Sequence, residues 1–311
     1  MKTVKIVLMP LLLASIIALF SITGCAGTGT TPQITTPSAA ATQEELNQQE
    51  LEEILYASMT NEANLDTYTF IMDMDINTDV IGEESVKMIV STKSNGAADL
   101  ASGQMHMRME MEMSAEGIGY EAGTQSLAYD VYQITDWIYM KMEVSGMGEQ
   151  WMKIRASEEM NEKLNLVDQQ LEPLGSAIEL KLLGYADVDG EECYVISIVP
   201  DIGKITQWLS EQQGAAIQDI DWADIPNLSD VFKNLEYTYY VTKNSRLPKK
   251  LVLNMQMEMT PLQLGEFNAN YDKMIMNISL DMTLSDFNEP SSITLPDEAQ
   301  DATEVSEDMF Q

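Results

Sequence analysis

Methionine is the residue type that offers this chain the most chemistry. The sequence holds 23 methionines among 311 residues, and five of them occupy every second position from Met105 to Met113. Thioether sulfur is a soft ligand that suits Cu(I). It is also a flexible, polarizable group that suits an apolar surface able to repack around different ligands. A third interpretation is that methionine simply fills a hydrophobic core, and the residue types alone leave all three open.

Other reactive side chains are scarce. The chain has one histidine, His106, and two cysteines, Cys25 and Cys193. These numbers exclude a Cys/His zinc cluster, a disulfide framework and any triad that needs a second histidine. The sequence also lacks a glycine-rich phosphate loop and a nucleophile elbow. We therefore predict a protein that is not an enzyme, with no catalytic residues, no metal site and no cofactor.

The charge balance limits the partners. There are 50 acidic and 17 basic residues, which gives a formal net charge of -33. A surface this acidic repels phosphate, so nucleic acid is not expected as a partner. The hydrophobic content of 45% is ordinary for a globular domain and provides a core.

The N-terminus has the composition of a targeting segment. Lys2 and Lys5 precede an apolar run that ends at Phe20, and Gly24 and Cys25 follow shortly after it. This pattern predicts a signal peptide over 1–24, because the apolar run is shorter than the ~20 residues that span a bilayer. A cysteine directly after a small residue, with Ile22 three positions earlier, resembles the lipobox of prokaryotic lipoproteins. That resemblance implies cleavage before Cys25 and acylation of its sulfur.

The rest of the chain divides into a tether and a folded body. Residues 25–43 combine the lipidated cysteine with small, uncharged residues and prolines, which is typical of a flexible tether. A capping box, Thr42 to Glu45, predicts that an amphipathic helix begins at Thr42 and runs to Ala63. Further helices are expected over 157–171 and from Asp201.

Period-two alternation predicts strands through most of the body. They cover 68–76, 86–90, 105–113, 127–144, 149–154, 178–188, 191–199, 236–243, 246–259 and 274–284. Asp189-Gly190 is a strong signal for a two-residue hairpin turn. Along the chain the predicted strands outnumber the predicted helices. This order of elements favours an α+β fold with one large antiparallel sheet.

Strand alternation gathers the methionines on one face of that sheet. The candidates for lining a ligand cavity on this face are Phe70, Met72, Met74, Met88, Met105, Met107, Met109, Met111, Met255, Met257, Met259, Met274, Met276 and Met282. His106 is predicted on the opposite face, which argues against a copper site. Cys193 lies in an apolar strand, so we expect a buried, inert thiol.

Several short segments of the sequence are familiar as a set. They are Leu65–Phe70 after the first helix, Trp137–Met142, Gly184–Tyr194, Arg246–Lys250, and Leu284–Pro290 leading into Ile293–Pro296. In this order they resemble the LolA-like superfamily of envelope lipoproteins, including the mycobacterial LppX/LprG-type lipid carriers. The resemblance implies a strongly curved antiparallel half-barrel over 44–298, with helices packed on its concave side and room for acyl chains between them. Residues 299–311 would form an acidic tail.

These observations favour a membrane-anchored, extracytoplasmic lipoprotein on the cell surface or in the periplasm. We expect it to bind, or to carry, a lipid or another apolar ligand in the half-barrel. The alternative is a non-enzymatic interaction or sensor module of the cell envelope whose core is filled. A methionine-rich copper binder ranks third. The sequence names neither the ligand nor a protein partner.

Overall fold

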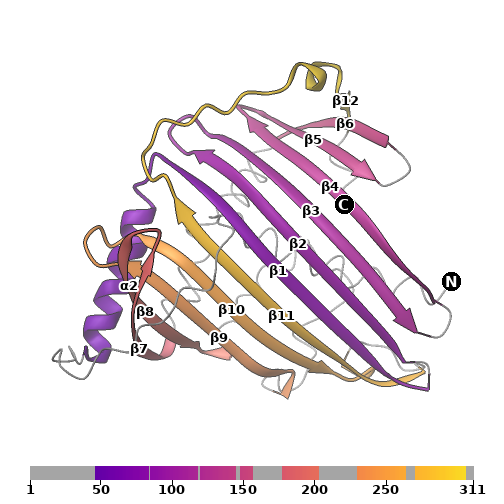
Figure 1. Ribbon diagram of the computed structural model, residues 1–311, viewed down its shortest axis with the longest axis horizontal. Helices are drawn as coiled ribbons and strands as arrows, with labels where there is room; N and C mark the ends of the chain where they lie inside the picture. The colour runs from indigo at the N-terminus through magenta and orange to yellow at the C-terminus, as the bar shows by residue number, and fades with distance from the viewer. Residues whose placement is uncertain are drawn as a thin grey trace.

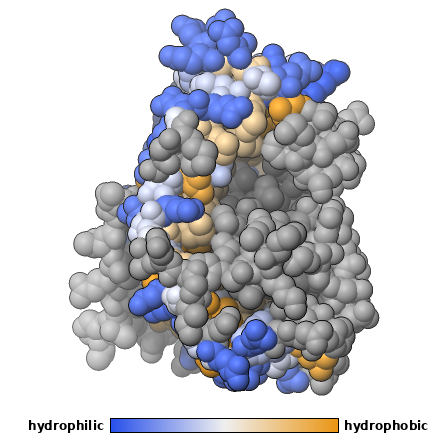
Figure 2. Space-filling view, turned by 90° about the vertical axis from the view of Figure 1, so that its right-hand side faces the viewer, coloured by the Kyte–Doolittle hydropathy of each residue, from blue (hydrophilic) through white to orange (hydrophobic). Residues whose placement is uncertain are grey.

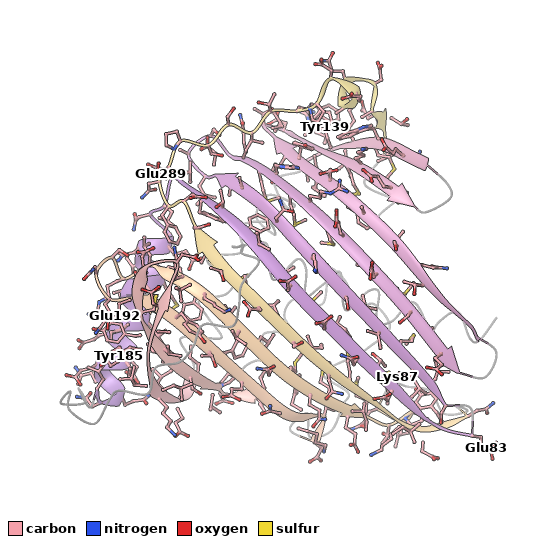
Figure 3. The ribbon with its side chains drawn as sticks, in the orientation of Figure 1. Glu83, Lys87, Tyr139, Tyr185, Glu192 and Glu289 are labelled. Carbon is pink, nitrogen blue, oxygen red and sulfur yellow. The ribbon has the colours of Figure 1, made fainter. Side chains whose placement is uncertain are left out.

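One large β-sheet organises the chain. The computed structural model describes residues 46–83, 85–117, 120–144, 148–156, 177–202, 230–263 and 270–305. Within these ranges the strands form a twelve-stranded sheet in the order β12-β6-β5-β4-β3-β2-β1-β11-β10-β9-β8-β7 (Figure 1). The strands are β1 (Thr67–Gly82), β2 (Val86–Asp99), β3 (Gln104–Gly117), β4 (Tyr120–Ile134), β5 (Trp137–Val144), β6 (Gly148–Arg155), β7 (Ala177–Val188), β8 (Glu191–Pro200), β9 (Phe232–Thr242), β10 (Pro248–Met259), β11 (Tyr271–Ser285) and β12 (Thr303–Glu304). The prediction of a curved antiparallel sheet is confirmed. In Figure 3 the label Tyr139 identifies β5, near one edge of the sheet, and the label Tyr185 identifies β7 at the other edge.

The centre of the sheet joins the two ends of the sequence. Strand β1 pairs with β2 on one side and with β11, some 200 residues later, on the other. The β1–β11 register runs from Thr69 opposite Ser285 to Gly82 opposite Tyr271. Strands β2 to β6 then continue outward by successive hairpins from β1, and β10 to β7 continue outward from β11.

The described helix α2 (Gln48–Glu62) precedes the sheet. We expected a helix to begin at Thr42, but residues 46 and 47 are not helical and Asn47 is the N-cap. Asn47 Oδ1 accepts a hydrogen bond from the Glu50 backbone N–H at 3.1 Å, and Glu50 Oε2 accepts from the Asn47 N–H at 2.8 Å. Asparagine is a strong N-cap, so this second capping box sets the start of α2. The motif Thr42–Glu45 lies outside the described residues.

Helix α2 and the methionines share one face of the sheet. Leu51, Ile54 and Leu55 of α2 are buried in a cluster with Tyr239 of β9. Tyr239 is opposite Leu251, Leu251 is opposite Met282, and Met282 is opposite Met72. Residues directly opposite each other in antiparallel strands point to the same face. We call this face, which carries α2 and Met72, the inner face, and the other the outer face.

The turns between strands test the predictions made from local sequence. Asp189 and Gly190 have φ angles of 53° and 82°, as a type I′ turn requires, so the predicted hairpin is confirmed. The stretch 127–144, expected as continuous strand, instead turns at Thr135-Asp136, and Thr135 has a φ of 52°. The helices expected over 157–171 lie outside the described residues, as does all but the first two residues of the helix expected from Asp201.

The C-terminal region adds an edge strand that its composition did not suggest. A short 3-10 helix, η3 (Asp297–Asp301), leads into β12, and β12 pairs in parallel with β6. Thr303 lies opposite Met152, and the Val305 N–H donates to the Lys153 carbonyl at 3.0 Å. The sheet therefore extends into the segment expected as an acidic tail.

One glycine allows a close approach on the inner face. Gly96 lies opposite Phe70, and a Cβ at position 96 would come within 2.6 Å of the Phe70 ring and also meet the His106 carbonyl oxygen. The Phe70 side chain is 1% exposed. The aromatic ring thus covers the glycine, a cross-strand arrangement that fills the gap left by a missing side chain.

Hydrophobic and hydrophilic residues occupy different parts of the surface in the side view (Figure 2). In the side view of Figure 2, described hydrophobic residues gather in the middle, and hydrophilic residues lie above and below them. No helix in the described part of the chain is both long and apolar enough to cross a membrane.

The assignment of faces predicts opposite effects for two neighbouring substitutions. Met111 is 5% exposed, whereas Glu112 points to the outer face and is exposed. We expect Met111→Asp to lower the free energy of unfolding by several kcal/mol, because it buries an unpaired carboxylate. Glu112→Lys should change it by no more than about 0.5 kcal/mol. Denaturant titrations of both variants test this, and equal midpoints would contradict the assignment.

Candidate functional site

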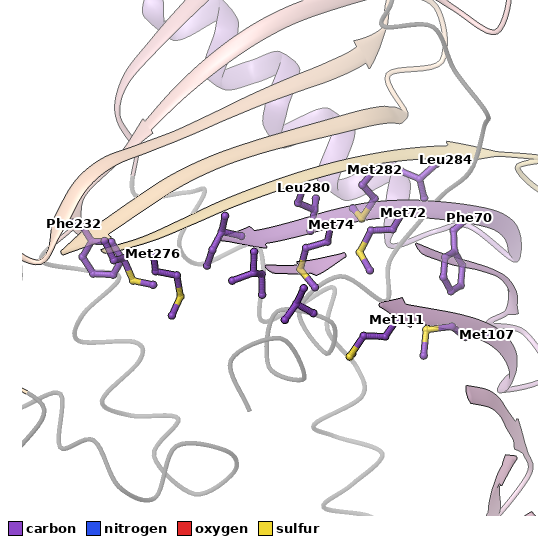
Figure 4. Close-up of a cluster of buried hydrophobic side chains, with 14 of the residues drawn as sticks. Phe70, Met72, Met74, Met107, Met111, Phe232, Met276, Leu280, Met282 and Leu284 are labelled. Atoms are coloured by element: carbon purple, nitrogen blue, oxygen red, sulfur yellow. The ribbon is translucent and has the colours of Figure 1, made fainter. Parts of the chain in front are cut away.

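The structure brings nearly all of the predicted cavity residues together on the inner face (Figure 4). One buried cluster contains ten of them: Phe70, Met72, Met74, Met107, Met111, Met257, Met259, Met274, Met276 and Met282. Met105, Met109 and Met255 are partly buried and pack against this cluster. Met88 is buried at 1% exposure but lies outside it. We call the cluster, with the three residues packed against it, the methionine face.

Strand register explains why these residues meet. Met257 lies opposite Met276, and Met259 lies opposite Met274, so β10 and β11 present methionines in pairs. Met282 of β11 in turn lies opposite Met72 of β1. An unbranched side chain with three rotatable bonds adapts its shape more readily than leucine or isoleucine. The methionine face is therefore a continuous apolar surface that can adjust to what covers it.

Three hydroxyl groups interrupt this apolar surface. Thr92 lies between Met74 and Met111, and Ser94 lies between Met72 and Met109. Both side chains are 1% exposed, and among the described residues neither hydroxyl has a hydrogen-bond partner. Thr78, on the same face of β1, is also 1% exposed, and its hydroxyl has no hydrogen-bond partner among the described residues.

These hydroxyls were not among the site residues predicted from the sequence. The available signal was in β2, where Thr92 and Ser94 continue the inward positions of Met88 and Val90 with polar residues. Buried polar groups without partners are few in native proteins and call for a specific explanation, such as a bound molecule. The hydroxyls thus give the methionine face two adjacent points for hydrogen bonding.

A buried carboxyl group lies at the end of α2. Glu62 and Ser58 are one helical turn apart on the buried side of α2, with exposures of 8% and 0%. Within the described residues, no hydrogen bond or ion pair reaches the Glu62 carboxylate. Burial raises the pKa of Glu62 to about 7, because removal from water disfavours the charged form.

The outer face of β3 to β5 carries the charged groups that flank His106. The His106 ring stacks on Tyr132 with centroids 4.2 Å apart, and its Nε2 lies 3.3 Å from Asp130 Oδ1. Arg108 donates to Asp130 at 2.6 Å and to Glu110 at 3.0 Å. These contacts confirm that His106 points away from Met105 and Met107, as the alternation predicted. They form a structural network of ion pairs and ring contacts.

The two cysteines have different positions. Cys193 is buried with 0% exposure, as predicted, and burial raises the pKa of its thiol to about 12, which disfavours the reactive thiolate. Cys25, the predicted lipidation site, lies outside the described residues. Within the described ranges, no group of three or more His, Cys, Asp or Glu side chains is placed to hold a metal ion.

The Glu62 carboxyl predicts a specific pH dependence of stability. Its folded pKa of about 7 lies above the ordinary value of 4.5, so the folded state binds the proton more tightly than the unfolded state. The contribution of Glu62 to stability is then greatest below pH 4.5 and is lost as the pH rises through 7. By linkage the loss approaches about 3 kcal/mol.

We expect Glu62→Gln to remove this dependence. At pH 8 the variant should be more stable than the wild type by up to about 3 kcal/mol, and near pH 4.5 the two should be alike. Urea titrations at several pH values measure this, with Glu52→Gln on the exposed side of α2 as the control. Wild-type and Glu62→Gln curves that stay parallel across the pH range would contradict the buried carboxyl.

Comparison with solved structures gives low sequence identity and wide coverage. LprF from Mycobacterium bovis is 12% identical, with 80% of this chain and 97% of that chain covered and a TM-score of 0.39. The lipoprotein LppX from Mycobacterium tuberculosis is 11% identical, with coverage of 80% and 100% and a TM-score of 0.34. A β-barrel-like protein of the domain of unknown function DUF1849 from Brucella abortus is 10% identical, with coverage of 71% and 99% and a TM-score of 0.26.

Among curated proteins, none matches the chain at a significant level. The family model of DUF6612, a family of unknown function, matches residues 50–304, which include most of α2 and every strand described above. The chain therefore belongs to the DUF6612 family.

Proposed function

We propose that this protein is a membrane-anchored, extracytoplasmic lipoprotein that binds a lipid or another apolar ligand against the methionine face. The observation that carries the proposal is the composition of that face. Methionines from β1, β3, β10 and β11 form one apolar surface, and such side chains repack around ligands of different shape. An acyl chain has no fixed shape of its own, so an adaptable lining suits it.

The buried hydroxyls support the same proposal. Thr92 and Ser94 lie in β2, each flanked by methionines of β1 and β3. A ligand with an oxygen acceptor near its acyl chain would satisfy both hydroxyls and leave the chain against sulfur and methyl groups. A hydrogen bond made in such a site is strong, because water does not compete for it.

The proposed anchor is the lipid on Cys25. Residues 26–43 would then separate the membrane from the folded body, and a flexible chain of this length has a typical span of about 20–25 Å. A tether of this length would hold the sheet close to the bilayer without inserting it. An acidic surface, repelled by anionic lipid headgroups, also favours a tethered position over an adsorbed one.

The anchor is tested by Cys25→Ala. We expect this variant to lose metabolic labelling with a fatty acid and to leave the membrane fraction or remain unprocessed. Cys193→Ala, which changes the buried cysteine, is the matched control and should be labelled and located like the wild type. Normal labelling of Cys25→Ala would refute the anchor.

Ligand binding is tested by native mass spectrometry of the purified protein and by titration with a fluorescent fatty acid. Met276→Trp enlarges a side chain at the centre of the methionine face, where Met276 is 0% exposed. If the face borders ligand space, the variant should bind the fatty acid at least tenfold more weakly, while its melting temperature changes little. Ile275→Trp, the next residue on the outer face, is the control and should leave binding unchanged.

The opposite result would favour the interaction module. In a filled core, the added ring of Met276→Trp typically costs about 1–3 kcal/mol of stability. Strong destabilisation together with no binding by the wild-type protein would mean that the methionines only pack against other parts of the protein. The protein would then act in the envelope through its surface.

A further inference from the structure

The outer face carries a row of carboxamides that the lipid-binding proposal does not use. Asn77 of β1 lies opposite Asn277 of β11, Asn277 lies opposite Gln256 of β10, and Gln256 lies opposite Asn234 of β9. Four adjacent strands thus each contribute one side-chain amide at the same level of the sheet. We call these four residues the amide row.

The amide row lines a shallow depression of about 280 Å³. Asn254 and Ser279, which lie opposite each other one step along the strands, also line it. Asn254, Asn234 and Ser279 are exposed, and Asn77, Asn277 and Gln256 are half-buried. The volume of the depression is close to the lower end of the range for small-molecule sites.

Two features set the amide row apart from an ordinary solvated strand face. Asparagine is disfavoured in strands, yet it occupies neighbouring positions on several of them here. Carboxylates flank the row on the same face of three strands, with Asp75 and Asp79 on β1, Glu258 on β10 and Glu236 on β9, whereas the flanking positions of β11 are the uncharged Ile275 and Ser279. In a chain with a net charge of -33, an uncharged stretch bordered by carboxylates is distinctive.

Most of the hydrogen-bonding capacity of the row is free. Gln256 Nε2 donates to Asn277 Oδ1 at 2.9 Å, which fixes the orientation of both amides. The side chains of Asn77, Asn234 and Asn254 make no hydrogen bond with any described residue. Each amide offers two N–H donors and one carbonyl acceptor. The depression therefore presents donors and acceptors together in a setting that repels anions.

These properties match an uncharged ligand with many hydroxyl groups. A hydroxyl both donates and accepts, as a carboxamide does, so neighbouring hydroxyls of a sugar ring can pair with one amide. Adjacent strands lie about 4.8 Å apart, which is comparable with the length of one ring in an extended β-linked polysaccharide. One amide per strand thus gives one amide per sugar.

We propose that the amide row is a binding site for an extended, uncharged polysaccharide that lies across β1, β11, β10 and β9. The site is on the face opposite the methionines, so it is independent of lipid binding. An envelope protein with both faces occupied would hold an apolar ligand on one side of its sheet and a glycan strand on the other.

Isothermal titration of the purified protein with soluble tetrasaccharides tests the site. Cellotetraose and chitotetraose are extended β-linked chains, and maltotetraose is a curved α-linked chain of the same length. We expect at least one extended chain to bind at least tenfold more tightly than maltotetraose. Absence of binding by both extended chains, or equal binding by all three, would overturn the proposal.

Two asparagine variants then locate the site. Asn277→Leu removes the central amide, and it should weaken binding of the extended chain at least tenfold. Asn95→Leu changes an exposed asparagine on the outer face of β2, outside the row, and should alter binding less than twofold. Circular dichroism confirms that both variants fold. Equal loss of binding in the two variants, or none in Asn277→Leu, would refute the assignment to the amide row.

Discussion

The pairing of β1 with β11 is the interaction on which the rest of the structure depends. It joins the β1–β6 half of the sheet to the β7–β11 half through strands that are some 200 residues apart in sequence. Its register determines the rest, because a slip by one residue would turn every side chain of a strand to the other face. The pairing also places Asp73 opposite Asp281, which is unfavourable by itself. Lys250 Nζ lies 2.7 Å from Asp281 and Lys93 lies opposite Asp73, so each carboxylate has a nearby cation.

The register gives the two faces of the sheet different chemistry. Methionines meet on the inner face and exclude water from one another. The outer face instead carries carboxylates such as Asp281, which is partly exposed and pairs with the buried Lys250. Charge of one sign at this density keeps the outer face soluble and keeps anions away. The amide row is the place on that face where neutral hydrogen-bonding groups lie side by side across four strands. The two proposed ligands, one apolar and one hydroxylated, follow from this division.

Polar groups buried on the inner face are the unusual feature of an otherwise apolar interior. A hydroxyl or carboxyl without a partner lowers stability by about 1–3 kcal/mol or more. Thr78, Thr92 and Ser94 all lie in this condition within the described structure. Replacing them with apolar residues of similar shape would be expected to stabilise a core that only had to fold. Their presence supports a role in which the inner face meets a molecule with polar groups of its own.

The sequence by itself determined the properties that depend on neighbouring residues. Period-two alternation assigned Met72 and Met111 to one face and His106 to the other, because successive side chains of any strand point in opposite directions. Asp189-Gly190 predicted its own turn, since the required φ angles depend on those two residues. The start of α2 was predicted wrongly, because two capping boxes lie close together and the pattern does not rank them.

Tertiary structure decided which strands are neighbours and at what register. No local pattern states that Met282 lies opposite Met72, or that Met88 is buried outside the cluster formed by the other methionines. The amide row could not be predicted from the sequence for the same reason. Its four residues become adjacent only when β1, β11, β10 and β9 pair. Backbone hydrogen bonds between strands are the same for every sequence. The choice among registers is therefore made by the packing of whole faces, which no single segment contains.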